Sequence, residues 1–147
     1  MSRTLAALLV LLASVQCAAA GEPPQEQDAW FALLPGHFVL VGRLPDNGAS
    51  YFGKAVISAQ GHGFTLSRTI GARTITATGT IEVPSPPGEG RILRFRWQDP
   101  GPRLMSCQVQ GDLDNYARLS CLWVIEGHKH KAPGLESYFS TEAWPEN

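Results

Sequence analysis

Short runs in which apolar and polar residues alternate fill the chain from residue 37 to residue 126, and turn-forming residues separate them. Seven such runs predict β-strands over residues 37–44, 50–58, 64–70, 73–83, 92–98, 104–110 and 117–126. Because side chains on a strand point alternately to its two faces, most of these strands would bury one face and expose the other. None of the connections is long enough to hold a crossover helix, so we expect the strands to run antiparallel in a meander.

The last two runs contain two cysteines, and these runs fit together in one register. If the turn between them is centred on Asp114, Cys107 faces Cys121 on the apolar face of the hairpin. The same register places Val109 opposite Leu119 and Met105 opposite Trp123 on that face, and leaves Ser106, Gln108, Gln110, Arg118 and Ser120 on the other. We therefore predict a disulfide between Cys107 and Cys121, with two separate buried thiols as the alternative.

The fourth run predicts a half-buried strand, because threonines alternate with apolar residues from position 74 to position 83. Small residues lie among the larger inward candidates, at Gly53, Ala55, Ala77 and Gly79. Glycine inside a strand often marks a bend or a close approach, which favours a strongly coiled sheet. With an eighth strand over residues 135–141, the sheet would close into a small up-and-down barrel and remove its exposed edges. An open two-layer sandwich is the alternative.

A short helix is predicted before the first strand. Asp28 is a suitable N-cap, the apolar residues Trp30, Phe31 and Leu33 follow it, and Pro35 ends the segment. We expect this helix to plug or flank an apolar part of the sheet.

Residues 1–20 have the composition of a secretory signal peptide, with Arg3 before an apolar stretch and three alanines before the expected cleavage point. The remaining segment, 21–147, is about the size of one domain. It holds two cysteines, as expected for a disulfide in an oxidising compartment, so we predict a secreted, periplasmic protein. No apolar run is long enough for a membrane span. With 11 basic against 13 acidic residues after the leader, nucleic acid is not an expected partner.

The turn before the last predicted strand of the cystine hairpin resembles the second signature of the lipocalins. Its residues are Gly111, Asp112, Leu113, Asp114, Asn115, Tyr116 and Ala117, followed by Arg118, Leu119, Ser120 and Cys121. Gly36, His37 and Phe38 resemble the opening Gly-x-Trp of that family, with phenylalanine in place of tryptophan. This resemblance implies a calycin-type barrel that is open at one end to a cavity for a small apolar molecule. It also implies that the regions of Gly36 and Asp112 close the other end.

Inward-facing residues of the predicted strands are the candidates for ligand contacts. Arg68 interrupts an otherwise apolar face, so it is expected either to pair inside the barrel or to meet an anionic head group of a ligand. The further candidates are Tyr51, Phe64, Phe95 and Trp97. On the outward side, Arg91, Arg94 and Arg96 form a basic stripe, which is either a solvated face or a docking surface for an acidic partner.

The sequence contains little that indicates a catalytic or metal site. There is no Gly-x-Ser-x-Gly motif, and the two cysteines are expected to be oxidised, so we predict no enzyme activity and no cofactor. Glu126, His128 and His130 alternate as zinc or copper ligands could, but the sequence places no fourth ligand beside them. The same residues suit a solvated loop, and we predict no metal site.

These patterns predict a non-enzymatic binding protein that holds a small apolar or amphipathic ligand in a β-barrel. The alternative is a secreted inhibitor or interaction module, which would block a hydrolase or dock an acidic partner through its basic face or through the loop at residues 84–90.

Overall fold

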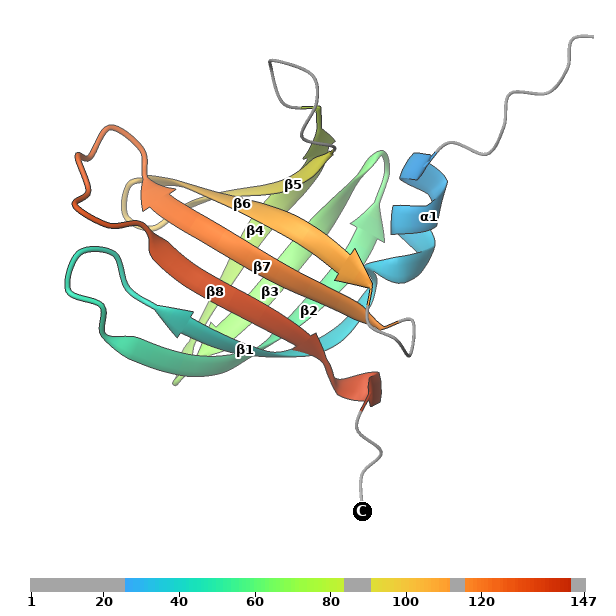
Figure 1. Cartoon of the computed structure of the whole chain (residues 1–147), viewed down its shortest axis with the longest axis horizontal. Helices are drawn as coiled ribbons and strands as arrows, with labels where there is room; N and C mark the ends of the chain where they lie inside the picture. The colour runs from blue at the N-terminus through green and yellow to red at the C-terminus, as the bar shows by residue number, and fades with distance from the viewer. Residues whose placement is uncertain (1–25, 84–90, 112–115, 144–147) are drawn as a thin grey trace, which may run out of the picture.

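The computed structural model describes residues 26–83, 91–111 and 116–143 of the chain. They form an N-terminal helix, eight β-strands and one 3-10 turn: α1 (Glu26–Leu33), β1 (Gly36–Arg43), β2 (Ser50–Gln60), β3 (Gly63–Ile70), β4 (Arg73–Glu82), β5 (Ile92–Gln98), β6 (Pro102–Gly111), β7 (Ala117–Ile125), β8 (Gly134–Ser140) and η1 (Thr141–Ala143). Each strand pairs antiparallel with its neighbours along the chain, and β8 pairs with β1. The sheet is therefore a closed up-and-down barrel (Figure 1).

The predicted all-β barrel is confirmed, and the sandwich alternative is excluded. All eight predicted strands are present, with ends that differ by no more than two residues from those expected. Inward and outward faces also agree with the alternation of residues in the sequence. In β5, for example, Leu93, Phe95 and Trp97 are buried, whereas Arg96 is exposed on the outer face.

The predicted register of the cystine hairpin is confirmed. Cys107 on β6 lies opposite Cys121 on β7, with a distance of 4.0 Å between their Cα atoms, and the two form a disulfide. In the same pairing, Met105 lies opposite Trp123 on the buried face. The disulfide thus joins two strands in the barrel wall with both sulfurs facing the core.

Helix α1 covers one end of the barrel, on the right in Figure 1. The Phe31 ring stacks on Phe64, at the start of β3, with 4.6 Å between ring centroids, and Leu34 is fully buried. The helix begins at Glu26, so Asp28 lies inside it, and the prediction that Asp28 is the N-cap is wrong. Its expected role as a plug is confirmed, because its apolar side chains pack on the interior of the barrel.

The opposite end of the barrel carries the β1–β2, β3–β4, β5–β6 and β7–β8 connections, which lie on the left in Figure 1. We call this the open end, since α1 does not cover it. The β1–β2 turn uses backbone conformations with positive φ at Asp46 (63°) and Gly48 (67°), which aspartate and glycine adopt more readily than most residues.

None of the described helices has the length and apolar character that crossing a membrane requires. Three predicted features lie outside the described residues: the leader at 1–20, the loop at 84–90 and the turn residues Asp112, Asp114 and Asn115.

Candidate functional site

Two oppositely charged side chains lie inside the barrel and pair with each other. Arg68 projects inward from β3 and Glu136 from β8, and they are only 4% and 1% exposed. Arg68 Nη1 donates to Glu136 Oε1, so the pair bridges the interior between two strands that are not neighbours in the sheet. A charge removed from water is very costly unless it is paired and hydrogen-bonded, and here each residue supplies the partner of the other.

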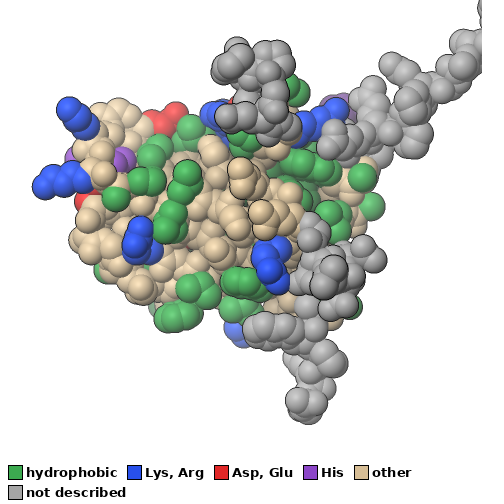
Figure 2. Space-filling view, viewed as in Figure 1, with side chains coloured by type: hydrophobic (Ala, Val, Ile, Leu, Met, Phe, Trp, Pro, Cys, Tyr) green, Lys and Arg blue, Asp and Glu red, His purple; other side chains and the backbone are tan. Residues whose placement is uncertain are grey.

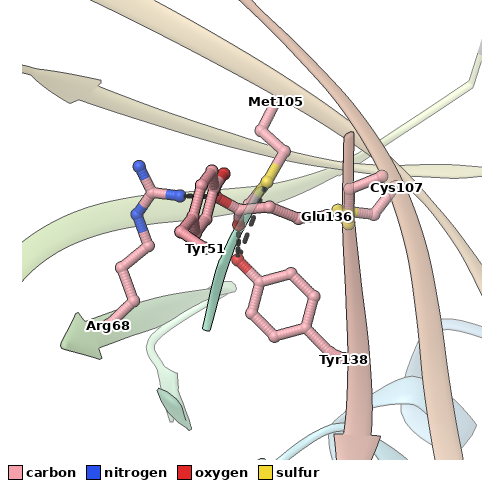
Figure 3. Close-up of a disulfide and its surroundings, with 7 residues drawn as sticks. Tyr51, Arg68, Met105, Cys107, Glu136 and Tyr138 are labelled. Atoms are coloured by element: carbon pink, nitrogen blue, oxygen red, sulfur yellow. Dashed lines mark hydrogen bonds and ion pairs between the residues drawn. A yellow bond between two sulfur atoms is a disulfide. The ribbon is translucent and has the colours of Figure 1, made fainter. Parts of the chain in front are cut away.

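Two tyrosine hydroxyl groups complete the hydrogen bonding of Glu136. Tyr51 on β2 donates to Oε1 at 2.5 Å, and Tyr138 on β8 donates to Oε2 (Figure 3). The Tyr51 oxygen in turn accepts a hydrogen bond from Trp123 Nε1 at 3.1 Å. We call these five side chains, Arg68, Glu136, Tyr51, Tyr138 and Trp123, the Glu136 network.

The network keeps its arginine charged and its tyrosines neutral. Burial, and then the negative charge of Glu136, raise the pKa values of Tyr51 and Tyr138 above the ordinary value for tyrosine. Burial alone would lower the pKa of Arg68, but the charge of Glu136 and the bond to it raise that pKa overall. The network therefore combines the guanidinium of Arg68, the carboxylate of Glu136 and two neutral hydroxyl donors.

The guanidinium group of Arg68 stacks over the Trp97 ring, and its Cζ atom lies 4.4 Å from the ring centroid. This cation–π contact fixes the plane of the guanidinium group. Arg68 Nε is a buried donor that has no hydrogen-bond partner among the described residues. A buried donor without a hydrogen bond costs about 1–3 kcal/mol.

A cavity of about 340 Å³ lies at the open end, directly outside the Glu136 network. Its lining combines apolar and charged side chains from five strands and two connections: Leu44, Ser50, Tyr51, Arg68, Ile70, Arg73, Ile75, Asp99, Arg103 and Trp123. Ligand sites typically have volumes of roughly 300–1,000 Å³, so this cavity is suited to a small molecule. The rest of the interior is filled by buried side chains.

The charges around the cavity leave an excess of positive charge. Asp99, only 8% exposed, accepts a hydrogen bond from Arg73 Nη2. Arg103 donates through Nε to the Asp99 backbone oxygen and lies over the Trp123 ring, 5.4 Å from its centroid. Arg103 has no carboxylate partner within the part of the chain that the structure describes. With Arg68 balanced by Glu136 and Arg73 by Asp99, one positive charge remains.

The structure divides the five predicted ligand contacts into two groups. Tyr51 and Arg68 line the cavity, and Trp97 contacts the guanidinium group of Arg68 through the face of its ring. Phe64 and Phe95 do not line it. Phe64 packs against α1 at the covered end, and Phe95 is fully buried against Gly79 in the wall of the barrel. Of the two expected roles of Arg68, the internal ion pair is present.

The predicted basic stripe lies on the outer face but is partly neutralised. Arg94 and Arg96 both reach Glu82 on the adjacent strand, at 3.2 Å and 2.8 Å. The hydrogen bond from Arg96 holds the pKa of Glu82 below its ordinary value. Arg91 also has an interaction partner. This surface therefore offers a weaker positive field to an acidic partner than the sequence alone indicates.

Several residues of the Glu136 network and the cavity were not predicted as ligand contacts from the sequence: Glu136, Tyr138, Trp123, Asp99, Arg73 and Arg103. For Glu136 a signal existed. It shares the inward face of the predicted strand at 135–141 with Tyr138, so a charged residue occupies a position where the alternation demands burial. Asp99 and Arg103 flank a turn, and only their positions in space show that they meet at the cavity.

A second hollow, of about 410 Å³, lies on the wall formed by β6, β7 and β8. The outward-facing residues Ser106, Gln108, Ser120, Leu122, Leu135 and Ser137 line it. Leu122 is 53% exposed there. Glu136 also lines this hollow but is only 1% exposed, and the outward-facing residues named above are uncharged, so the hollow is less suited to select a charged ligand than the cavity at the open end.

Comparison of the chain with protein-family models, with curated proteins and with solved structures finds no match. The resemblance to the lipocalins therefore stays a prediction from the short motifs.

Proposed function

We propose that this is an exported, non-enzymatic binding protein that holds a small amphipathic anion, most simply a carboxylate, at the open end of its barrel. The observation that carries the proposal is the cavity beside the Glu136 network, with its unbalanced positive charge at Arg103. Export is inferred from the predicted leader and is supported by the disulfide between Cys107 and Cys121.

The lining favours a ligand with two chemically different parts. Ile70, Ile75 and Leu44 offer apolar contacts, and Trp123 offers an aromatic face. Guanidinium groups bind carboxylates through paired hydrogen bonds, and Arg103 lies at the cavity with its charge unbalanced. The body of the ligand would contact the apolar residues while its charged group reaches Arg103.

The Glu136 network is the rigid floor of this site. Arg68 is held by Glu136 on one side and by Trp97 on its face, so it does not have to be ordered when a ligand arrives. Binding sites lose less free energy on association when their polar groups are already fixed. This arrangement explains why a small barrel would retain an ion pair in its interior.

A pair of probes with the same body tests the proposal: 2-naphthoate, which carries a carboxylate, and 2-naphthamide, which is neutral. Calorimetric titration should show tighter binding of the naphthoate. A charged hydrogen bond contributes about 1.5–3 kcal/mol, so Arg103→Gln should weaken naphthoate binding by roughly 10- to 100-fold and leave naphthamide binding unchanged. Arg43→Gln, on the outer face at the same end, is the matched control and should change neither.

The outcomes separate the two parts of the proposal. Equal affinity for the two probes, unaffected by Arg103→Gln, would show that the site does not select an anion. If neither probe binds, and protein from its own host carries no small molecule in native mass spectrometry, the binding function itself is refuted.

The inhibitor alternative receives less support from the described residues. Its basic stripe is neutralised in part by Glu82, and its loop at 84–90 lies outside them.

A further inference from the structure

Two loops at the open end bring together three side chains with metal-ligand chemistry. Asp46 comes from the β1–β2 turn, and His128 and His130 come from the β7–β8 loop. One ligand atom from each lies within 4.8 Å of the others. The sequence already places the two histidines two positions apart, and the fold adds a carboxylate that is more than eighty residues away in the chain. Figure 2 shows histidine side chains at this end of the molecule, beside lysine or arginine side chains.

From this cluster we infer a binding site for a divalent transition metal, with Zn²⁺ as the reference ion, formed by Asp46, His128 and His130. Two imidazoles and one carboxylate, with water in the remaining position, are a donor set that zinc accepts. Imidazole favours Zn²⁺, Cu²⁺ and Ni²⁺, whereas Ca²⁺ and Mg²⁺ prefer sites made of oxygen ligands. Glu126, the third candidate from the sequence, is not part of the cluster.

The carboxylate of Asp46 is oriented by its surroundings. Its Oδ1 accepts hydrogen bonds from the backbone nitrogens of Lys131, at 2.6 Å, and Ala132, at 3.3 Å. Its Oδ2 is directed at His130 Nδ1, at 2.8 Å. Backbone donors that hold one carboxylate oxygen and leave the other for the ion are the usual support around a metal ligand. The site is therefore largely preformed on the Asp46 side.

Binding would require one rearrangement at His130. Its Nε2 now accepts a hydrogen bond from the Ile125 backbone nitrogen at 3.0 Å, so Nδ1 carries the proton and donates it to Asp46. When the metal takes Nδ1, the single ring proton moves by way of solvent from Nδ1 to Nε2, so the bond to Asp46 and the bond from Ile125 are both lost. Two ordinary hydrogen bonds are weak compared with the metal–ligand bonds gained, so this exchange favours the ion.

Both positive and negative side chains lie near the proposed metal site. Lys129 and Lys131 flank the histidines in the chain and are exposed, so salt and solvent screen their repulsion of a cation. Asp46 provides the opposing charge within the cluster.

The test is calorimetric titration of the oxidised full chain, purified without a histidine tag, with ZnCl₂ and separately with CaCl₂ at neutral pH. We expect one Zn²⁺ per chain and no Ca²⁺ binding. His128→Ala should weaken Zn²⁺ binding by about tenfold or more, and Asp46→Asn should do the same while keeping an acceptor for the two backbone donors. His62→Ala is the matched control, because His62 is an exposed histidine near the covered end, and it should leave binding unchanged.

A thermal unfolding series gives a second readout, since an ion that binds only the folded protein raises its melting temperature. Zn²⁺ should raise the melting temperature of the natural protein and of His62→Ala, but not of His128→Ala. The inference is overturned if Zn²⁺ does not bind, if Ca²⁺ binds equally well, or if His128→Ala binds Zn²⁺ as tightly as His62→Ala does. None of these results depends on whether the cavity binds an organic anion.

Discussion

The internal ion pair allows a sharp test of how the barrel interior is organised. Arg68 and Glu136 are both almost completely removed from water. Removing one member of a buried pair leaves the other charge without compensation, which costs about 3–5 kcal/mol. We therefore expect Arg68→Met and Glu136→Gln each to lower the free energy of unfolding by about that amount. Since domains of this kind have total stabilities of about 5–15 kcal/mol, either change would remove a large fraction.

The double variant, Arg68→Met with Glu136→Gln, contains no unpaired buried charge. Its glutamine oxygen still accepts a hydrogen bond from one of the two tyrosines, so the expected loss is only about 1–3 kcal/mol. If the two sites were independent, the losses of the two single variants would add, and the double variant would lose roughly 6–10 kcal/mol. Guanidinium chloride unfolding of the oxidised proteins, followed by circular dichroism, gives all the values needed for a double-mutant cycle.

The surface pair of Arg96 and Glu82 is the matched control for this cycle. Its atoms lie 2.8 Å apart, but Arg96 is 46% and Glu82 34% exposed, so the coupling between them should be below about 1 kcal/mol. If the two single changes in the interior proved additive, the view of Arg68 and Glu136 as mutually dependent charges would be refuted. A double variant that folds when a single one does not would support it.

Three further predictions concern the rest of the structure. Tyr51 and Tyr138 have raised pKa values in the folded protein, so above about pH 10 these tyrosines lose their protons in the unfolded chain first. The free energy of unfolding should then fall by roughly 2.7 kcal/mol per pH unit for the two groups together. Tyr51→Phe should halve this slope when unfolding is measured at a series of alkaline pH values. Gly134→Ala would place a Cβ 2.3 Å from the Trp123 indole, so we expect a loss of about 1–3 kcal/mol and altered tryptophan fluorescence, and an unchanged spectrum would contradict this contact. Cys107→Ser should cost about 3 kcal/mol in urea unfolding, as expected for a disulfide that spans 14 positions; no change would show that the disulfide does not constrain the unfolded chain.

The strands and their faces could be predicted because both are local properties of the sequence. The alternation of Leu93, Phe95 and Trp97 with Arg94 and Arg96 fixes which side of β5 faces inward, whatever the rest of the chain does. The cystine hairpin could likewise be aligned because its turn is short and its two cysteines must meet. The barrel itself followed from the need to cover the sheet edges.

The position of a residue along the barrel axis could not be predicted in the same way. Phe64 and Arg68 lie on the same face of the same strand, yet Phe64 packs under α1 and Arg68 lines the cavity. Depth depends on how the strands are staggered around the closed barrel, which is not visible in any single strand. The pairing of Arg68 with Glu136 depends on closure too, because strands β3 and β8 are not neighbours in the sheet.

The connectivity of the sheet has a consequence for how the chain folds. Seven of the eight strand pairings join segments that follow one another in the sequence, so they can form as successive hairpins. The seam between β1 and β8, where Phe38 meets Ser140, needs the two ends of the described chain to come together, and closing such a long loop is slow. Until β1 and β8 pair, the edges of both strands are free to pair with other chains, so the incomplete sheet is the species most prone to aggregate.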